Sequence, residues 1–276
     1  MSGVCEKTEA GKALGGGDVR GDIAYNQLVS KENIWRAWET FSRGKWKQTA
    51  VRTFWLQAER EVFSLYHDLL AGTFAHGKYT YFPVNDTKPR DVYVATVRDK
   101  VVHQMIATYI EQRWGTHLYR HSYAAQREKG VTAARQYVLK TIRRLYAQRQ
   151  VWIGKLDVEK YFLNINHEIL LRLLSRRITD SRIIDLCRKV VESFGENGCG
   201  VPLGNVTSQW FANIYLHELD WCAKHVLKIR YYMRYNDDII IVGTNRQQIK
   251  EWSVVVQRFV RDELHLTIPI HKVAFV

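Results

Sequence analysis

Several common features of protein sequences are scarce or missing in this chain of 276 residues. It has four prolines and four cysteines, and the cysteines form neither a C-x-x-C pair nor another spacing typical of metal sites. No uncharged apolar run is long enough to cross a bilayer, and the N-terminal MSGVCEKTEAGKALGGGDVRG holds no apolar signal core. These absences argue against a disulfide-stapled secreted protein and against a membrane protein. They predict a cytoplasmic location without a membrane partner.

Acidic residues are also in the minority. The chain has 28 Asp and Glu against 41 Lys and Arg, which gives a formal net charge of +13. Such an excess of positive charge predicts a polyanionic partner, most often nucleic acid. A basic soluble protein without such a partner is the alternative that composition leaves open.

The first half of the chain has a mainly helical pattern. Residues 1–22 are Gly-rich and polar and are expected to form a disordered leader. Helical periodicity follows from about 29 to 70, a hairpin is expected over 78–97, and helices over about 99–114 and 131–149. Most of the tryptophans in the first helical region are expected in the core, with base stacking open for one or two: Trp35, Trp38, Trp46 and Trp55.

The second half combines strands and helices. We expect a strand that ends at Asp157, a hairpin over 229–243 and a strand over 264–268. Helices are expected over about 167–177, 181–194, 207–227 and 246–264. The sequence therefore predicts an α+β fold in which a small antiparallel sheet packs on helices.

One predicted helix is strongly basic. The helix over 131–149 carries Arg135, Lys140, Arg143, Arg144 and Arg149. A solvated surface and a face that binds a nucleic-acid backbone are about equally compatible with this pattern.

Three aspartates stand out because they lie at strand ends. Asp237 and Asp238 are adjacent in RYNDDIIIV, and Asp157 ends the strand KLD. If the two strands lie side by side, the carboxylates converge, and their mutual repulsion makes sense if divalent cations neutralise them. Two Mg²⁺ ions about 4 Å apart would serve an in-line phosphoryl transfer. Ordinary turn chemistry is the alternative for the Asp pair taken alone.

Strand alternation suggests unequal roles for the two neighbours. If the strand continues into the turn, Tyr235 and Asp237 share one face of the sheet, and Asn236 and Asp238 share the other. On this basis Asp237 is expected to be the stronger metal ligand.

The segments around these aspartates resemble the palm of a reverse transcriptase. KLDVEKYFLNINH, GVPLGNVTSQWFANIYLHELD and YMRYNDDIIIVG follow in the family's order, and the Y-x-D-D box is formed by residues 235–238. KPRDVYVATVRDKVVHQ and SYAAQREKGVTAA resemble the blocks that contact template and nucleotide. The resemblance covers about 27–276. It implies a right-hand polymerase fold with fingers over 23–150 and a palm over 151–276, and it leads us to expect that the thumb is absent or truncated.

The middle motif indicates a subtype. Leu203-Gly204-Asn205-Val206-Thr207-Ser208-Gln209 has an aliphatic residue before the glycine and a glutamine after the serine, which resembles the enzymes of diversity-generating retroelements. Those enzymes copy a template RNA into cDNA with frequent errors at template adenines, and they work with a small basic accessory protein. A retron, group II intron or phage-defence reverse transcriptase is the second interpretation, and a non-catalytic RNA-binding module is the third.

The resemblance also implies roles for single residues at the metal and sugar positions. Asp157, Asp237 and the carbonyl of Val158 would hold two Mg²⁺ ions, with Asp238 in support. Phe162 stands at the position of the sugar gate, where a ring clashes with a 2′-hydroxyl and so favours dNTPs; ordinary core packing is its alternative.

Further residues are assigned to nucleotide and template by the same resemblance. Lys88, Arg90 and Arg98 would grip the triphosphate, unless they are only solvated charges. Leu203, Gly204 and Gln209 would border the incoming nucleotide, and Lys272 would lie near the pyrophosphate. Tyr235, Arg127 and Lys129 would contact template or primer. Because Leu203 replaces a hydrogen-bonding glutamine, we hypothesise that it loosens geometric checking and lowers fidelity.

Overall fold

The structure, a computed structural model, describes residues 25–85, 89–126, 129–147 and 150–276. The helices and strands of the first half are α1 (Tyr25–Leu28), α2 (Lys31–Ser42), α3 (Thr49–Leu56), α4 (Ala58–Leu70), β1 (Thr80–Asn85), β2 (Pro89–Val94), α5 (Val97–Trp114) and α6 (Val131–Tyr146). Those of the second half are β3 (Trp152–Asp157), α7 (His167–Ser175), α8 (Ser181–Val191), α9 (Val206–Tyr215), α10 (His217–Trp221), β4 (Tyr231–Tyr235), β5 (Asp238–Gly243), α11 (Arg246–Leu264) and β6 (Val273–Phe275). Short helical turns at Tyr161–Asn164, Cys222–Val226 and Ile270–Lys272 complete the order. The predicted leader, residues 1–22, lies outside the described residues.

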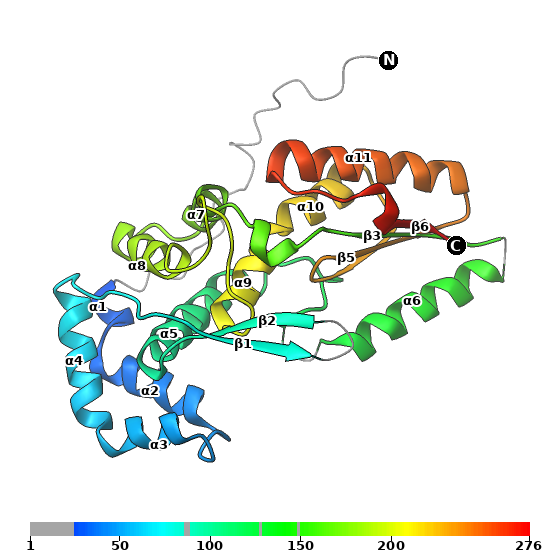
Figure 1. Ribbon diagram of the computed structural model, residues 1–276. Helices are drawn as coiled ribbons and strands as arrows, with labels where there is room; N and C mark the ends of the chain where they lie inside the picture. The colour runs from blue at the N-terminus through cyan, green and yellow to red at the C-terminus, as the bar shows by residue number, and fades with distance from the viewer. Residues whose placement is uncertain (1–24, 86–88, 127–128, 148–149) are drawn as a thin grey trace.

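A four-stranded antiparallel sheet forms the centre of the second half. Its strand order is β4-β5-β3-β6, while β1 and β2 form a separate hairpin (Figure 1). The helix α11 packs closely on one face of the sheet, because a Cβ atom added at Gly154 would lie 2.7 Å from Ile249 of that helix. The other face meets α6 through a small cluster that includes Met233, Tyr235 and Ile240. The predicted α+β arrangement is therefore confirmed.

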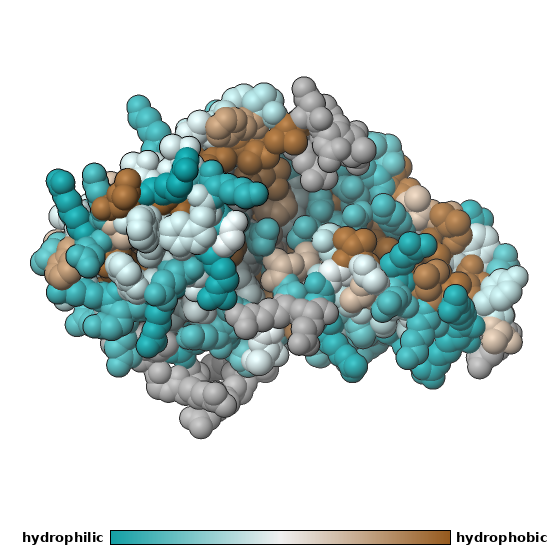
Figure 2. Space-filling model, turned by 90° about the horizontal axis from the view of Figure 1, so that it is seen from below, coloured by the Kyte–Doolittle hydropathy of each residue, from teal (hydrophilic) through white to brown (hydrophobic). Residues whose placement is uncertain are grey.

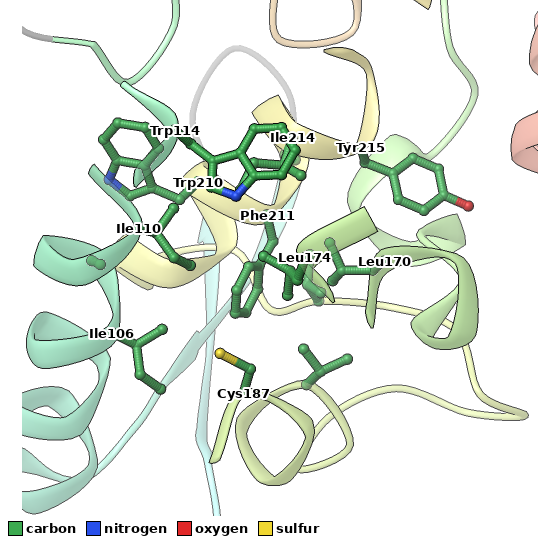
Figure 3. Close-up of a cluster of buried hydrophobic side chains, with 14 of the residues drawn as sticks. Ile106, Ile110, Trp114, Leu170, Leu174, Cys187, Trp210, Phe211, Ile214 and Tyr215 are labelled. Atoms are coloured by element: carbon green, nitrogen blue, oxygen red, sulfur yellow. The ribbon is translucent and has the colours of Figure 1, made fainter. Parts of the chain in front are cut away.

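One hydrophobic core runs through both halves of the chain. Four helices, α5, α7, α8 and α9, bring their apolar side chains together in it (Figure 3). Phe211 of α9 lies among residues of its neighbours, with Ile110 of α5 and Leu174 of α7 on either side. Because this core fixes α9 against α5, it also fixes the turn before α9 relative to the β1–β2 hairpin. No helix in the described part of the chain is long and apolar enough to cross a membrane.

Two predicted elements differ from the structure. The single helix expected over 207–227 is divided into α9, α10 and a π-helical turn, with Leu216 between the first two. The strand expected over 264–268 is irregular, because His265 adopts φ 51° at the end of α11 and Pro269 follows closely. Its alternating apolar residues are nevertheless buried, and the edge of the sheet is taken instead by β6.

The prediction that most tryptophans of the first helical region lie in the core is wrong. Only Trp38 of these four is buried, whereas Trp35, Trp46 and Trp55 are 37, 48 and 55% exposed. The buried face of α2 is formed by Ile34, Trp38 and Phe41, which recur at helical spacing, and Trp35 lies next to that face. Trp46 and Trp55 contact each other edge to face, with ring centroids 6.0 Å apart.

Candidate active site

The antiparallel register brings the predicted carboxylates to one end of the sheet. Asp157 is the last residue of β3 and pairs directly with Asp238, the first residue of β5. Tyr235, the last residue of β4, pairs with Asp238 from the other side. Since residues directly opposite in a sheet project on the same face, Tyr235, Asp238 and Asp157 form one row across three strands.

The turn between β4 and β5 corrects the predicted alternation. Asn236 has φ 50°, in the left-handed region, so it starts a two-residue turn with Asp237 and does not continue the strand. Tyr235 therefore shares a face with Asp238, and not with Asp237 as expected. The backbone carbonyl of Asp237 accepts a 3.4 Å hydrogen bond from the N–H of Val158, which joins the turn to the residue after Asp157.

The surroundings of Asp237 are unfavourable for an ionised carboxyl group. Burial raises the pKa of its carboxyl group, and the negative charges of Asp157 and Asp238 raise it further. Hydrogen bonding to the backbone and the charge of Lys272 act in the opposite direction. A carboxylate held in this environment gains from any cation placed beside it.

The other two carboxylates, those of Asp157 and Asp238, each have a lysine beside them. Lys272, in the turn before β6, donates a 2.6 Å hydrogen bond to Asp157 Oδ1. Lys155 Nζ lies 3.3 Å from Asp238 Oδ1. Lys272 thus lies at the carboxylates, and its expected place near the pyrophosphate stays a prediction. Lys155 was not among the predicted site residues. Strand alternation could have indicated it, because it lies two residues before Asp157 and on the same face of the sheet.

The donor set suits Mg²⁺, although the side chains do not form a ready-made cage. In the described part of the chain no three or more His, Cys, Asp and Glu side chains gather closely enough to hold a metal ion by themselves. Mg²⁺ is commonly held by only one or two carboxylates, together with water and substrate phosphates. The all-oxygen set of Asp157, Asp237 and Asp238, with one carboxyl group destabilised by its neighbours, fits that mode of binding.

The predicted gate, Phe162, and the predicted nucleotide turn at Leu203 are linked through the backbone. Phe162 is half-buried against the main core, and its carbonyl accepts a 2.8 Å hydrogen bond from the N–H of Val201. Leu203 is half-buried, and its carbonyl accepts a 3.4 Å hydrogen bond from the N–H of Tyr93 in β2. The turn before α9 is therefore joined to both η1 (Tyr161–Asn164) and the hairpin.

Gly204 makes that close contact possible. Its φ of 105° lies in the region that favours glycine, and a Cβ atom would approach Val92 of β2 to 3.2 Å. Gly204 thus allows the turn before α9 to pack against β2. The close approach of a nucleotide to Gly204 stays a prediction.

Two of the predicted basic contacts, Arg98 and Lys129, have protein partners in the structure. Arg98 forms an ion pair with Asp68 and lies over the ring of Phe74, so its guanidinium is engaged between α4 and α5. Lys129 Nζ donates to Gln126 Oε1 at 2.6 Å and to the carbonyl of Ser122. Roles for these two in binding nucleotide or template stay predictions.

The remaining predicted contacts are less closely defined. Arg90 lies in β2 opposite Val84, and its side chain is outside the description. Gln209 is exposed on α9. Lys88 and Arg127 lie outside the described residues.

Comparison with known proteins agrees with this architecture. The family model "Reverse transcriptase (RNA-dependent DNA polymerase)" matches residues 83–276. The chain belongs to the reverse transcriptase family. The match includes the Y-x-D-D box, Asp157 and the whole four-stranded sheet, whereas the division into fingers and palm stays a prediction.

Individual relatives of this reverse transcriptase chain are distant. It is 27% identical to Protein YkfC of Escherichia coli over 169 residues, which is 58% of this chain and 44% of that protein. It is 28% identical to the group II intron-encoded protein LtrA of Lactococcus lactis over 153 residues, which is 53% of this chain and 24% of LtrA. The chain thus spans less than half the length of these relatives.

Solved structures show the same fold at low sequence identity. Telomerase from Candida albicans, in complex with a fragment of telomeric RNA, superposes with a TM-score of 0.54 at 13% identity over 72% of this chain and 42% of that one. Telomerase from Candida tropicalis gives the same TM-score of 0.54 at 12% identity.

Proposed function

We propose that this chain performs RNA-directed DNA synthesis, copying a template RNA into cDNA from dNTPs in the cytoplasm. The carrying observation is the pairing of Asp157 with Asp238 across β3 and β5, with Asp237 in the adjoining turn. Family membership supports the reaction. The relative LtrA is named as a group II intron-encoded protein, and the telomerase neighbours support the fold.

The three aspartates are proposed to hold two Mg²⁺ ions, with the carbonyl of Val158 as a further ligand. Such ions stabilise the attacking and leaving oxygens of a phosphoryl transfer. Lys272 is proposed to leave Asp157 and to meet the negative charge that develops on the pyrophosphate. Phe162 is proposed to exclude the 2′-hydroxyl of an rNTP, because its ring is already fixed by contact with the core.

Positive charge on the surface supports a nucleic-acid partner. The helix α6, which packs on the sheet next to Tyr235, exposes Arg135, Lys140, Arg143 and Arg144. No ion pair is formed by these four within the described residues. They are proposed to contact the phosphate backbone of template or primer. Figure 2 shows hydrophilic and hydrophobic side chains next to one another at the right of the view, the side on which α6 lies in Figure 1.

For the subtype, we propose a diversity-generating reverse transcriptase that makes frequent errors at template adenines and works with a small basic accessory protein. The support is the Leu203–Gln209 motif, and Leu203 is proposed to lower fidelity because it offers no hydrogen bond. The similarity to LtrA favours a second candidate, a group II intron type of enzyme.

Primer extension on a defined RNA template, with Mg²⁺ and dNTPs, tests both levels of the proposal. We expect cDNA, and sequencing of that cDNA is expected to show more errors opposite adenine than opposite the other three bases. Leu203→Gln is expected to reduce the adenine errors. Extension with uniform errors would favour the second candidate, and the absence of cDNA, with and without an accessory protein, would favour a non-catalytic RNA-binding module.

A further inference from the structure

A fully buried arginine, Arg234, contacts the Asn236–Asp237 turn. The side chains of Arg234 in β4 and Asp220 in α10 are both 0% exposed and form a two-pronged ion pair. Arg234 Nε donates to Asp220 Oδ1 at 2.9 Å, and Nη2 donates to Oδ2 at 2.7 Å. The hydroxyl of Tyr232 donates to the same Asp220 Oδ1 at 2.8 Å. Burial opposes the charge on Arg234, but Asp220 outweighs this effect and raises the pKa of the guanidinium.

The other N–H groups of Arg234 reach the turn and the neighbouring helix. Nη1 donates to the carbonyl of Asn236 at 3.0 Å and to Asn213 Oδ1 at 3.3 Å, and Nη2 donates to the Asn213 carbonyl at 3.4 Å. A guanidinium has five N–H donors, and five acceptor contacts are present here. A lysine ammonium has three donors from a single nitrogen and cannot reproduce this arrangement.

The contact with Asn236 falls at a backbone position in the left-handed region. Asn236 has φ 50°, and its conformation determines where Asp237 is placed. The carbonyls of both turn residues are held, that of Asn236 by Arg234 and that of Asp237 by the N–H of Val158. A two-residue turn held at both carbonyls has little freedom to move its carboxylate.

The same arginine joins the turn to the segment that precedes α6. The backbone N–H of Arg234 donates to the carbonyl of His121 at 3.0 Å, and its carbonyl accepts from the N–H of Tyr123 at 2.9 Å. Asn213 continues the connection, because its Nδ2 donates to the carbonyl of Ala124 at 2.8 Å. Arg234 therefore joins residues 121–124 through its backbone and α9 through its guanidinium.

We propose that Arg234 is a positioning residue, which fixes the Asn236–Asp237 turn so that Asp237 lies where the metal-dependent reaction needs it. The effect of Arg234 on catalysis rests on the proposed function, whereas its role in fixing the turn does not. A buried ion pair contributes little net stability compared with apolar residues of similar size, whereas one unpaired member is costly. The hydrogen bond to Asn236 is a contact that an apolar pair could not replace.

Two variants separate positioning from simple stability. Arg234→Lys keeps a positive charge for Asp220 but loses the two-pronged geometry and the bond to Asn236. The double variant Arg234→Met with Asp220→Leu removes both charges together, so no buried charge is left unpaired. Arg176→Met is the matched control, because Arg176 pairs with Glu218 of the same helix α10 at 2.7 Å but has no hydrogen bond to the turn.

Three measurements apply to each variant that unfolds cooperatively. Hydrogen exchange of the amides of residues 236–238 is expected to accelerate about tenfold, as a lost hydrogen bond to a charged donor implies. The affinity for Mn²⁺, followed by electron paramagnetic resonance, is expected to fall at least about tenfold. The kcat for nucleotide addition is expected to fall by a similar factor, while KM for the dNTP changes by no more than about threefold. The control is expected to change none of these.

Unchanged exchange at 236–238 in a folded variant would overturn the proposal, as would wild-type Mn²⁺ affinity and kcat in the double variant. A wild-type protein that adds no nucleotide would overturn the proposed function instead. In that case the exchange measurement still decides whether Arg234 fixes the turn.

Discussion

Asp237, which we propose as a metal ligand, has an environment that costs stability when its carboxyl group is ionised. Its carboxyl group is partly buried and stands near two other carboxylates, so ionisation in the folded protein is unfavourable. In the unfolded chain the same group titrates near its ordinary pKa of 3.8. The folded state therefore binds the proton more tightly. The stability contribution of this group is full below the unfolded pKa and is lost as the pH rises through the higher folded pKa.

Asp237→Asn is accordingly expected to stabilise the metal-free protein at pH 7. The gain should appear as the pH rises from about 4 through the raised pKa of Asp237, and it should vanish at lower pH, where both states are protonated. Urea unfolding at several pH values in the presence of EDTA measures this. The exposed Asp185→Asn is the control and should give no gain. A lower unfolding midpoint for Asp237→Asn at pH 7 would contradict the electrostatic account of this residue.

At the scale of helices, exposure separates tryptophans that the sequence does not distinguish. Trp38 of α2 is buried and contacts Phe54 with ring centroids 4.6 Å apart, whereas Trp55 of α3 is 55% exposed. Trp38→Ala is expected to lower the free energy of unfolding by about 3–5 kcal/mol, because it leaves a large cavity. Trp55→Ala is expected to cost about 1 kcal/mol or less. Equal costs in urea unfolding would show that the assignment of the buried face is wrong.

The hairpin β4–β5 shows what could be predicted at the level of elements and what could not. Runs of strand-forming residues predicted both strands, and the Asn-Asp-Asp segment between them predicted a turn. The face of each aspartate was predicted incorrectly, because alternation assumes extended backbone and Asn236 adopts a positive φ. Similarly, 264–268 was predicted as a strand, but the segment is irregular and β6 takes the edge of the sheet.

The carboxylates of the site could be predicted from the sequence, but the buried residues that support them, Arg234 and Asp220, could not. The aspartates have a motif with fixed spacing, whereas Arg234 and Asp220 are fourteen residues apart and meet only in the folded chain. A lone arginine within the apolar strand YYMRY was the available signal, since a buried charge needs a partner. The partner itself cannot be inferred without the packing of α10 against β4.

On the scale of the whole molecule, one core positions two sequence-distant parts of the site. The helices α5 and α9 pack together, and as a result the turn at Leu203 and Gly204 meets β2 of the hairpin. The sheet supplies the carboxylates at its end, and α6 adds exposed positive charge beside it. The order of the motifs along the chain predicted this arrangement because it is the order shared by the reverse transcriptase family. The absence of a thumb stays a prediction.

The central claim is that Asp157, Asp237 and Asp238 together support metal-dependent nucleotide addition. Addition of one dNTP to a primer annealed to RNA tests it most directly, because a single addition does not depend on processive grip of the duplex. The wild-type chain is expected to extend the primer with Mg²⁺ and not with EDTA, and Asp157→Asn is expected to slow extension at least about 100-fold, or about 2.7 kcal/mol in activation free energy. Extension by Asp157→Asn at the wild-type rate, or no Mg²⁺-dependent extension by the wild type, would contradict the account.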